Sequence, residues 1–280
     1  MGDALILIHG FHVHANLDVD KPIYRCIKLG HLLDLHNRHF YFHSVIKWDD
    51  TWEIPSRYFQ PSNASYDSTQ LQMTNLNSSY LYGTCWTDSI DSDALWRIYS
   101  GDNKDGVCIK TTLRKLFSSI DIDPYNSQFL DGFVGPVIYK KDFIANNELS
   151  IFSEETNYYP RYMVPAFLKR YAFEHEHEIR FLVFAPFFNR VASGNGIYLP
   201  LKDTNFIDEL ILDPRLSDKD YNSFKRKLSL FNCSITKSQL YSVPDDIYDA
   251  TLSSVNQSIT HIKDSQRWNG SDFVHRELKD

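Results

Sequence analysis

The sequence EHEHEIRFLVFA, residues 174–185, joins a run of acids and histidines directly to a run of apolar and aromatic residues. An unbroken run of branched and aromatic side chains is typical of a strand that is buried on both faces. The pattern predicts a central strand over Glu176–Ala185. Because residues two apart on a strand share a face, the three glutamates are expected to line one side and the two histidines the other.

Short strands and helices are intermixed on both sides of this segment. Predicted strands are Ala4–Ile8, Ile23–Leu29, Phe40–Ser44, Tyr80–Thr87, Gly106–Thr111, Pro136–Tyr139, Ile197–Pro200 and Phe206–Leu212. Predicted helices are His31–Asn37, Asp93–Ser100, Leu113–Ser119, Ile151–Tyr162, Pro165–Phe173 and Ser217–Leu230, with Ser217 as a cap and one further helix within Ser56–Ser79. This order predicts an α+β fold, with a mixed or antiparallel sheet of short strands and flanking helices.

The chain shows no internal repeat and no composition typical of an interdomain linker, so residues 1–280 are predicted to form a single domain. The tail Asp264–Asp280 is polar and is expected to be loosely held. The apolar surroundings of the four residues that follow predict that their side chains are buried: Trp86, Trp96, Cys108 and Phe181.

Composition excludes some classes of protein. Twenty-nine basic and 36 acidic residues give a net charge of -7, which argues against coating nucleic acid or an anionic membrane by bulk charge. No run approaches 18 apolar residues, and the N-terminal residues lack the features of a signal peptide, so a cytoplasmic protein with no membrane partner is expected. The cysteines form no C-x-x-C pair and are predicted to be reduced core thiols: Cys26, Cys85, Cys108 and Cys233.

The glutamates at the start of the predicted strand are candidates for a functional site. A carboxylate pair at the mouth of a buried strand is held rigidly and can have a raised pKa. The alternative is a solvated strand edge, since three like charges in a row favour contact with water. His175 and His177 could instead bind a metal, but no other close pair of histidines supports that interpretation.

Several segments, taken in order, resemble the bacterial family catalogued as domain of unknown function 2971. They cover about residues 20–215, and the family's usual Asp-Pro and Ser are replaced here by Asp50-Thr51 and Thr87. The resemblance implies kinship of fold and names no activity. The matching segments are Tyr24-Arg25, Phe40–Ser44, Trp48–Glu53, Cys85-Trp86-Thr87, Leu95-Trp96, Tyr99, Gly106–Ile109, Glu176-x-Glu178-x-Arg180 and Ile207–Asp213.

The chain is also similar, more distantly, to the Arg-Ser/Thr-Glu type of ADP-ribosyltransferase. That resemblance places Tyr24-Arg25, Thr87 and Glu176-x-Glu178 in the family's order, and it implies NAD as substrate with no metal. Arg25, with Tyr24, would bind the NAD phosphates, and Thr87 would hold the nicotinamide ribose. Glu178 would stabilise the ribose cation, and Glu176 would orient or deprotonate an acceptor.

The resemblance implies transfer of ADP-ribose to a protein or nucleic-acid acceptor, or NAD hydrolysis, and a role as a toxin or defence effector.

Two alternatives stay open. A metal-dependent nuclease or phosphoesterase would use acids as Mg²⁺ ligands, although the sequence places no lysine beside them. A non-catalytic binding module needs no site geometry at all. Proximity of Glu178 to Arg25 and Thr87 would favour NAD chemistry, and proximity to Asp50 would favour metal. The metal-ligand candidates are Asp49, Asp50, Glu53, Glu176 and Glu178.

Overall fold

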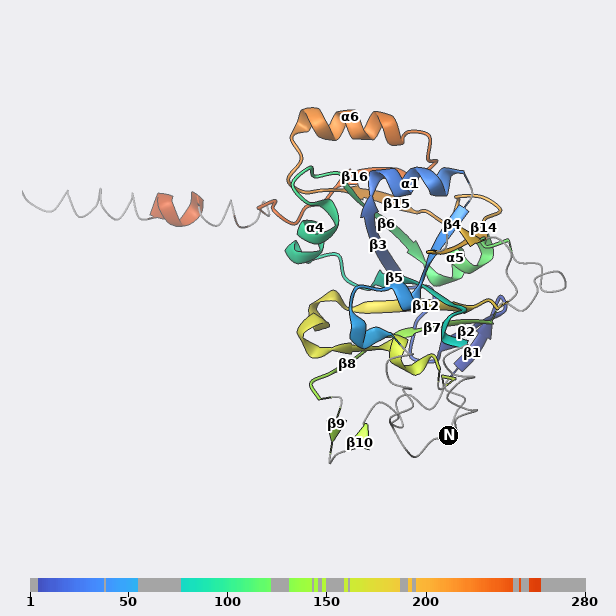
Figure 1. The fold of residues 1–280 in the computed structure, drawn as a ribbon. Helices are drawn as coiled ribbons and strands as arrows, with labels where there is room; N and C mark the ends of the chain where they lie inside the picture. The colour runs from blue at the N-terminus through green and yellow to red at the C-terminus, as the bar shows by residue number, and fades with distance from the viewer. Residues whose placement is uncertain are drawn as a thin grey trace, which may run out of the picture. The chain divides into compact units, whose positions relative to one another are not determined.

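The structure is a computed structural model, shown in Figure 1. It describes residues 5–37, 39–54, 77–121, 131–142, 144–145, 148–149, 159–160, 162–186, 191–192, 195–243, 247 and 252–257. The chain forms two compact units, Met1–Leu240 and Tyr241–Asp280. In the second unit residues 252–257 are helical, and the predicted loose tail lies outside the described residues. That residues 1–280 fold as a single domain stays a prediction.

One mixed sheet organises the first unit. Neighbouring strands are antiparallel except for the parallel pairs β2–β7 and β15–β16, and helices flank the sheet, which confirms the predicted α+β class (Figure 1). In the described part of the chain the sheet runs β1 (Leu5–Ile8), β2 (Phe11–His14), β7 (Asp131–Pro136), β12 (Glu178–Phe184), β5 (Leu81–Thr87), β3 (Pro22–Lys28), β6 (Gly106–Thr112), β15 (Glu209–Leu212) and β16 (Ser234–Lys237), with β4 (His39–Ser44), β14 (Gly196–Pro200) and β13 (Val191–Ala192) branching from β5.

Local capping accounts for three of the helix starts. Side chains of Ser92, Thr112 and Ser217 each accept a hydrogen bond from a backbone N–H in the first turn of the following helix, and Ser217 thereby confirms its predicted role. The helices are α1 (Leu29–His36), α4 (Asp93–Ser100), α5 (Leu113–Ser119) and α6 (Asp218–Leu228). The 3₁₀ turns and short strands are η1 (Val45–Lys47), η2 (Thr51–Glu53), β8 (Ile138–Lys140), β9 (Ile144–Ala145), β10 (Glu148–Leu149), η4 (Val164–Phe167), β11 (Leu168–Arg170) and η5 (Tyr171–Glu176).

Strand β12 is the central strand that the sequence predicts. It pairs along its length with β5 on one side and β7 on the other. Its Phe181 ring contacts three core rings edge-on, at centroid distances of 4.8, 5.0 and 5.4 Å for Phe11, Phe42 and Phe117. All four side chains predicted to be buried are buried, which confirms that prediction: Trp86, Trp96, Cys108 and Phe181.

The strand begins later than predicted, at Glu178. Glu174 and Glu176 belong to η5, and His177 ends this turn in the left-handed conformation with φ 45°. The prediction that all three glutamates alternate along one strand is therefore wrong. A left-handed residue reverses the chain direction just before β12, so local turn geometry overrides the period-two pattern there.

The predicted helix over Pro165–Phe173 is also wrong. Residues Leu168–Arg170 instead pair in parallel with Ile138–Lys140 of β8, and a 3₁₀ turn lies on either side. Pairing with a strand that is distant in sequence outweighs the helical pattern of this segment. The helix expected within Ser56–Ser79 and the one over Ile151–Tyr162 lie largely outside the described residues.

The cysteine prediction is wrong for one pair. Cys26 on β3 and Cys108 on β6 are partners in register, and they form a disulfide with Cα atoms 3.9 Å apart. They are 82 residues apart in the chain, so only the strand pairing reveals the bond. Cys85 and Cys233 are free, as predicted.

Strands β3 and β4 share one edge of β5 and diverge from it. Tyr24 of β3 pairs with Thr87 at one end of β5, whereas His43 of β4 pairs with Gly83 nearer the other end. Figure 1 shows β3 and β4 separating above β5, with α1 near their far ends. Residues 84–86 of β5 lie between these two pairings.

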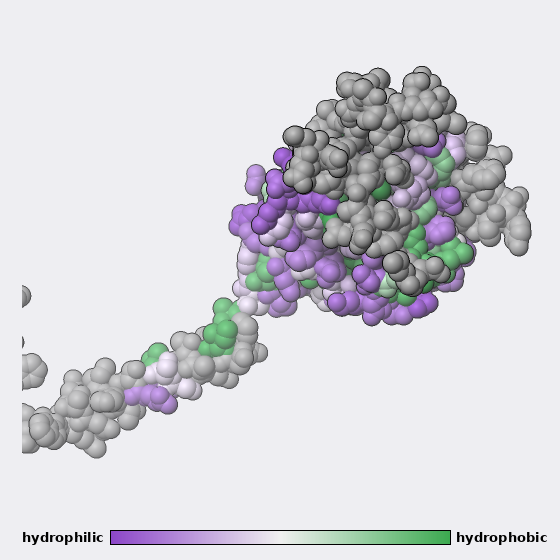
Figure 2. Space-filling view, turned by 90° about the horizontal axis from the view of Figure 1, so that it is seen from below, coloured by the Kyte–Doolittle hydropathy of each residue, from purple (hydrophilic) through white to green (hydrophobic). Residues whose placement is uncertain are grey.

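The coloured surface in Figure 2 is mostly hydrophilic, with smaller hydrophobic patches between the polar residues. None of the helices in the described ranges has the length and apolar character needed to cross a membrane.

Candidate functional site

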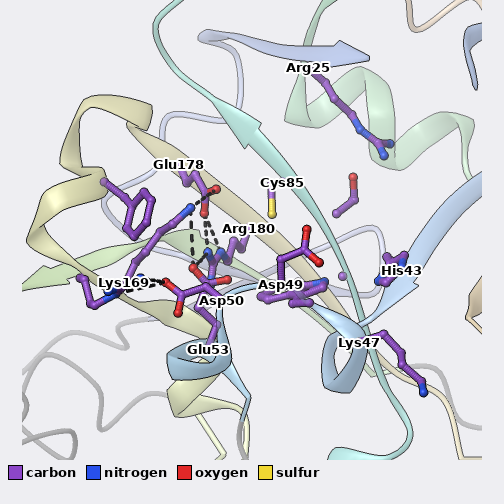
Figure 3. Close-up of a pocket in the computed structure, with 15 residues that line it drawn as sticks. Arg25, His43, Lys47, Asp49, Asp50, Glu53, Cys85, Lys169, Glu178 and Arg180 are labelled. Atoms are coloured by element: carbon purple, nitrogen blue, oxygen red, sulfur yellow. Dashed lines mark hydrogen bonds and ion pairs between the residues drawn. The ribbon is translucent and has the colours of Figure 1, made fainter. Parts of the chain in front are cut away.

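A cavity of 630 Å³ opens beside the charged end of β12 (Figure 3). This volume lies in the range of small-molecule sites. Its walls come from segments far apart in the sequence: β3, β4, β5, β11, β12 and the 3₁₀ turns η1, η2 and η5. The lining residues are Arg25, His43, Lys47, Trp48, Asp49, Asp50, Glu53, Gly83, Thr84, Cys85, Lys169, Arg170, Phe173, Glu178 and Arg180.

One wall carries a buried charge cluster, defined here as Glu53, Lys169, Glu176, Glu178 and Arg180. Arg180 Nε donates to Glu178 Oε2 at 2.7 Å, and its Nη2 lies 2.9 Å from Glu53 Oε1. Lys169 Nζ donates to Glu176 Oε2 at 2.6 Å and to Glu178 Oε1 at 3.0 Å. The cluster thus holds three carboxylates with two cations, and each Glu178 oxygen is bound by a cation.

The backbone explains how these residues meet. Alternation along β12 places Glu178 and Arg180 on the same face of the sheet, and alternation along β11 directs Lys169 toward them. Arg180 is completely buried; it also donates to the carbonyl oxygen of Ala166 at 2.7 Å and lies over the Trp48 ring at 4.6 Å. The cluster is therefore fixed before any ligand binds.

Burial and pairing shift the titration of the cluster in opposite directions. For Glu178, burial opposes ionisation, but Arg180 and Lys169 outweigh it and lower the pKa. For Glu176, burial and then a hydrogen bond to Glu178 raise the pKa to about 7. Burial likewise raises the pKa of Glu53 despite the charge of Arg180. Glu178 is thus a permanent anion, whereas Glu176 exchanges its proton near neutral pH.

Arg25 lies on another wall of the same cavity. In Figure 3 its side chain extends from the far side of the cavity, away from the Glu178 group. The guanidinium lies over the Phe40 ring at 5.3 Å and the Trp86 ring at 6.0 Å, and burial lowers the pKa of Arg25 to about 10. Among the described residues no carboxylate lies within ion-pairing distance of Arg25. A half-buried cation without an anion is suited to bind an anionic ligand.

The structure brings the predicted site residues to adjacent strands. Thr87 pairs with Tyr24 of β3 on one side and with Glu178 of β12 on the other. Arg25 and Glu178 line both the 630 Å³ cavity and a crevice of 20 Å³, whereas Tyr24, Thr87 and Glu176 line the crevice only. The Thr87 hydroxyl is engaged in a turn, because it donates to the carbonyl of Ser89 and accepts from its N–H.

Four of the five acids considered as metal ligands line the cavity, and Glu176 lies beside it; all except Asp49 are paired with a cation in the described part of the chain. Asp50 Oδ2 lies 3.1 Å from Arg170 Nη2, and Glu53 contacts Arg180 and Lys169. Across the described ranges no three His, Cys, Asp or Glu side chains are grouped to hold a metal ion. The fold places a lysine beside these acids: Lys169 contacts Glu53, Glu176 and Glu178.

Lys169 is the site residue that sequence reasoning missed. It lies in a segment whose pattern predicts a helix, and on a helix it would not face Glu178. Arg180 follows Glu178 at the two-residue spacing of a strand face, so that spacing could have indicated its role. Phe173, which also lines the cavity, belongs to no motif, whereas Trp48 begins the matching segment Trp48–Glu53.

The fold and the site define a class of structure. It is a mixed open sheet with a charged cavity beside β5, the strand whose one edge pairs with both β3 and β4. The family model described as "Protein of unknown function (DUF2971)" matches residues 95–181, which confirms the resemblance over that part of the chain. No curated protein matches. A solved structure, "Thermus sp. 2.9 DarT in complex with NAD+", is similar at a TM-score of 0.35 and 10% identity, over 80% of this chain and 98% of that chain.

Proposed function

We propose that this chain is an NAD-consuming enzyme of the ADP-ribosyltransferase type, which transfers ADP-ribose to a macromolecule or to water. One observation carries the proposal: a permanently ionised carboxylate, Glu178, and a cation with no carboxylate partner, Arg25, line one cavity of 630 Å³. Cleavage of NAD needs both charges. The diphosphate requires a cation, and the ribose becomes positive as its bond to nicotinamide breaks.

Arg25 binds the diphosphate in this proposal. Its planar guanidinium can donate two hydrogen bonds to one phosphate group. The aromatic rings of Phe40 and Trp86, over which the guanidinium lies, hold it in place. Lys47 and His43 line the same side of the cavity and add donors.

Glu178 stabilises the ribose cation. The C1′–nitrogen bond breaks with its electron pair passing to nicotinamide, which leaves as a neutral molecule. The bonds from Arg180 and Lys169 fix the carboxylate in position, so it need not reorganise during the reaction. With all five groups ionised, the three carboxylates exceed the two cations by one charge, which leaves the wall negative toward the developing cation.

Glu176 completes the reaction. An acceptor hydroxyl or water attacks C1′ and loses its proton to Glu176, whose pKa of about 7 suits a general base. Tyr24 and Thr87 continue the row of side chains from Glu178, and they hold the ribose side of the substrate. Contact with a ribose requires the Thr87 hydroxyl to exchange its bonds to Ser89.

The test is nicotinamide release from NAD by Glu178→Gln. The amide keeps the size of the carboxylate and removes its charge, so the rate is expected to fall about 10²-fold while the Kd for NAD changes much less. Asp20→Asn, which removes a carboxylate from an exposed pair with Arg114, is the matched control and should keep full activity. Glu178→Asp keeps the charge and guards against a loss that is due only to misfolding.

Two outcomes contradict the proposal. Undiminished nicotinamide release by a folded Glu178→Gln protein removes Glu178 from the mechanism. The absence of nicotinamide release by the wild-type protein, with or without added protein or nucleic acid, removes the activity itself and leaves the binding-module hypothesis.

Lys169 favours a second candidate, a metal-dependent phosphoesterase, because a lysine beside several acids is the arrangement that such a site needs. Against it, the acids Asp50, Glu53 and Glu178 are already paired with protein cations. Hydrolysis of a phosphodiester with Mg²⁺ or Mn²⁺, abolished by a chelator and by Lys169→Met, would support this candidate in place of NAD cleavage.

A further inference from the structure

A second cavity, of 500 Å³, lies between β3, β4 and α1. β3 and β4 are the two strands that share one edge of β5 (Figure 1). The second cavity shares two lining residues with the first cavity, Arg25 and His43, so the two spaces adjoin at these residues, and one of them is the cation that has no carboxylate partner among the described residues. The lining residues are Arg25, Ile27, His31, Asp34, Leu35, His39, Tyr41, His43, Asn195 and Tyr198.

Two tyrosines form an aromatic wall in this cavity. Tyr41 of β4 and Tyr198 of β14 are direct partners in register, and their ring centroids are 5.1 Å apart. Alternation along β4 sends Phe40 and Phe42 into the core and leaves Tyr41 on the cavity face. Gly196 keeps room for this ring, because a Cβ there would lie 2.6 Å from the Tyr41 hydroxyl.

We infer that this second cavity binds the nucleoside of a nucleoside diphosphate, with its base on the rings of Tyr41 and Tyr198 and its diphosphate at Arg25. Half-exposed aromatic rings accept the flat face of a base, and such stacking is a recurrent mode of nucleotide binding. Asp34 and Asn195 supply polar groups that can meet ribose hydroxyls. In this arrangement Arg25 lies at the junction of two sites and not at the edge of one.

The inference rests on the proposed function, because that function identifies the ligand as NAD, with a nicotinamide half and an adenosine half. A dinucleotide consists of two nucleosides joined by a diphosphate, and two cavities joined at one arginine match that plan. Of the two large cavities only the first is lined by Glu178, so the ribose whose bond is broken must lie on that side of Arg25. The second cavity then takes the adenosine half, which undergoes no reaction.

Calorimetric titration with ADP tests the site without requiring any catalysis. The Tyr198→Ala protein is expected to bind ADP about 10-fold or more weakly than the wild type, because the stacking surface is lost. Tyr198→Phe, which keeps the ring, is the matched control and should bind ADP within about 2-fold of the wild type. Titration with nicotinamide mononucleotide should show no change in Tyr198→Ala, because that ligand fits the first cavity.

The outcomes separate this inference from the proposed function. Unchanged ADP affinity in a folded Tyr198→Ala protein, or no binding of ADP by the wild type at millimolar concentration, overturns the inference even if NAD is cleaved. If Tyr198→Ala loses affinity for nicotinamide mononucleotide and keeps its affinity for ADP, the inference is also overturned, because the second cavity would then bind the nicotinamide half of the ligand. Weakened ADP binding in Tyr198→Ala, together with no cleavage of NAD, supports the nucleoside site and contradicts the proposed reaction.

Discussion

The two walls of the 630 Å³ cavity differ in how their arginines are paired. On one wall Arg180 is fully buried and contacts the carboxylates of Glu178 and Glu53. On the other wall Arg25 has two aromatic rings and no carboxylate partner among the described residues. The pKa values respond accordingly: pairing raises the pKa of Arg180, whereas burial lowers that of Arg25.

This difference separates a structural cation from a binding cation. Removing one member of a buried ion pair leaves an uncompensated charge, so the Arg180 wall is expected to contribute to stability. A half-buried cation without an anion costs free energy that a bound anion can restore, so the Arg25 wall is expected to contribute to affinity. Each prediction below compares the two walls.

Arg180→Met should have the largest effect, on folding. It leaves Glu178 and Glu53 buried beside a single remaining cation, Lys169, and should lower the free energy of unfolding by about 3–5 kcal/mol. Urea denaturation measures this change. Arg97→Met, which breaks the exposed pair with Asp93, is the control and should cost less than about 1 kcal/mol. Equal losses in the two variants would mean that burial does not distinguish the cluster.

Arg25→Met should have its effect on the ligand and not on the fold. The variant loses the cation that the diphosphate needs, so the Kd for NAD and for ADP should rise about 10- to 100-fold. The free energy of unfolding should stay within about 1 kcal/mol of the wild type, because no ion pair is broken. A large loss of stability with unchanged affinity would make Arg25 a structural cation like Arg180.

The pH dependence of stability should show the smallest effect. Glu176 is expected to be its main source, and the raised pKa of Glu53 acts in the same direction. The pKa of Glu176 is about 7 in the folded state and near 4.5 in an unfolded chain, so the folded state binds more protons between these values. Stability from this group is therefore fully present below about pH 4.5, and about 2 kcal/mol of it is lost between about pH 5 and pH 7.

Denaturation series at several pH values can test this dependence. Glu176→Gln should remove most of the decline between about pH 5 and 7. The lowered pKa of Glu178 acts in the opposite direction, adding stability as the pH rises toward 4.5. Glu178→Gln should therefore reduce the decline only in part, because burial, the larger cause of the raised Glu176 pKa, remains. An unchanged profile in Glu176→Gln would show that Glu176 is not the group that titrates.

Local pattern predicted the features that depend on local interactions. The apolar run that ends at Ala185 became the central strand, because its residues suit a strand buried on both faces. Ser217 caps α6 through a bond to a residue three positions later. The order Arg25, Thr87 and Glu178 along the chain predicts one shared site, and that stays a prediction; the order did not indicate that the Thr87 hydroxyl would be used in a turn.

The sequence by itself determined the class of fold, the buried aromatic residues and the segment that carries the acids, since periodicity and composition are properties of the chain alone. Only the tertiary structure decided that Lys169 faces Glu178, that Cys26 bonds Cys108 and that Arg25 joins two cavities. Each of these depends on which strands pair: β11 with β8, β3 with β6, and both β3 and β4 with one edge of β5. Strand pairing is set by long-range packing that short motifs do not encode, so the partners of each charge became visible only in the folded sheet.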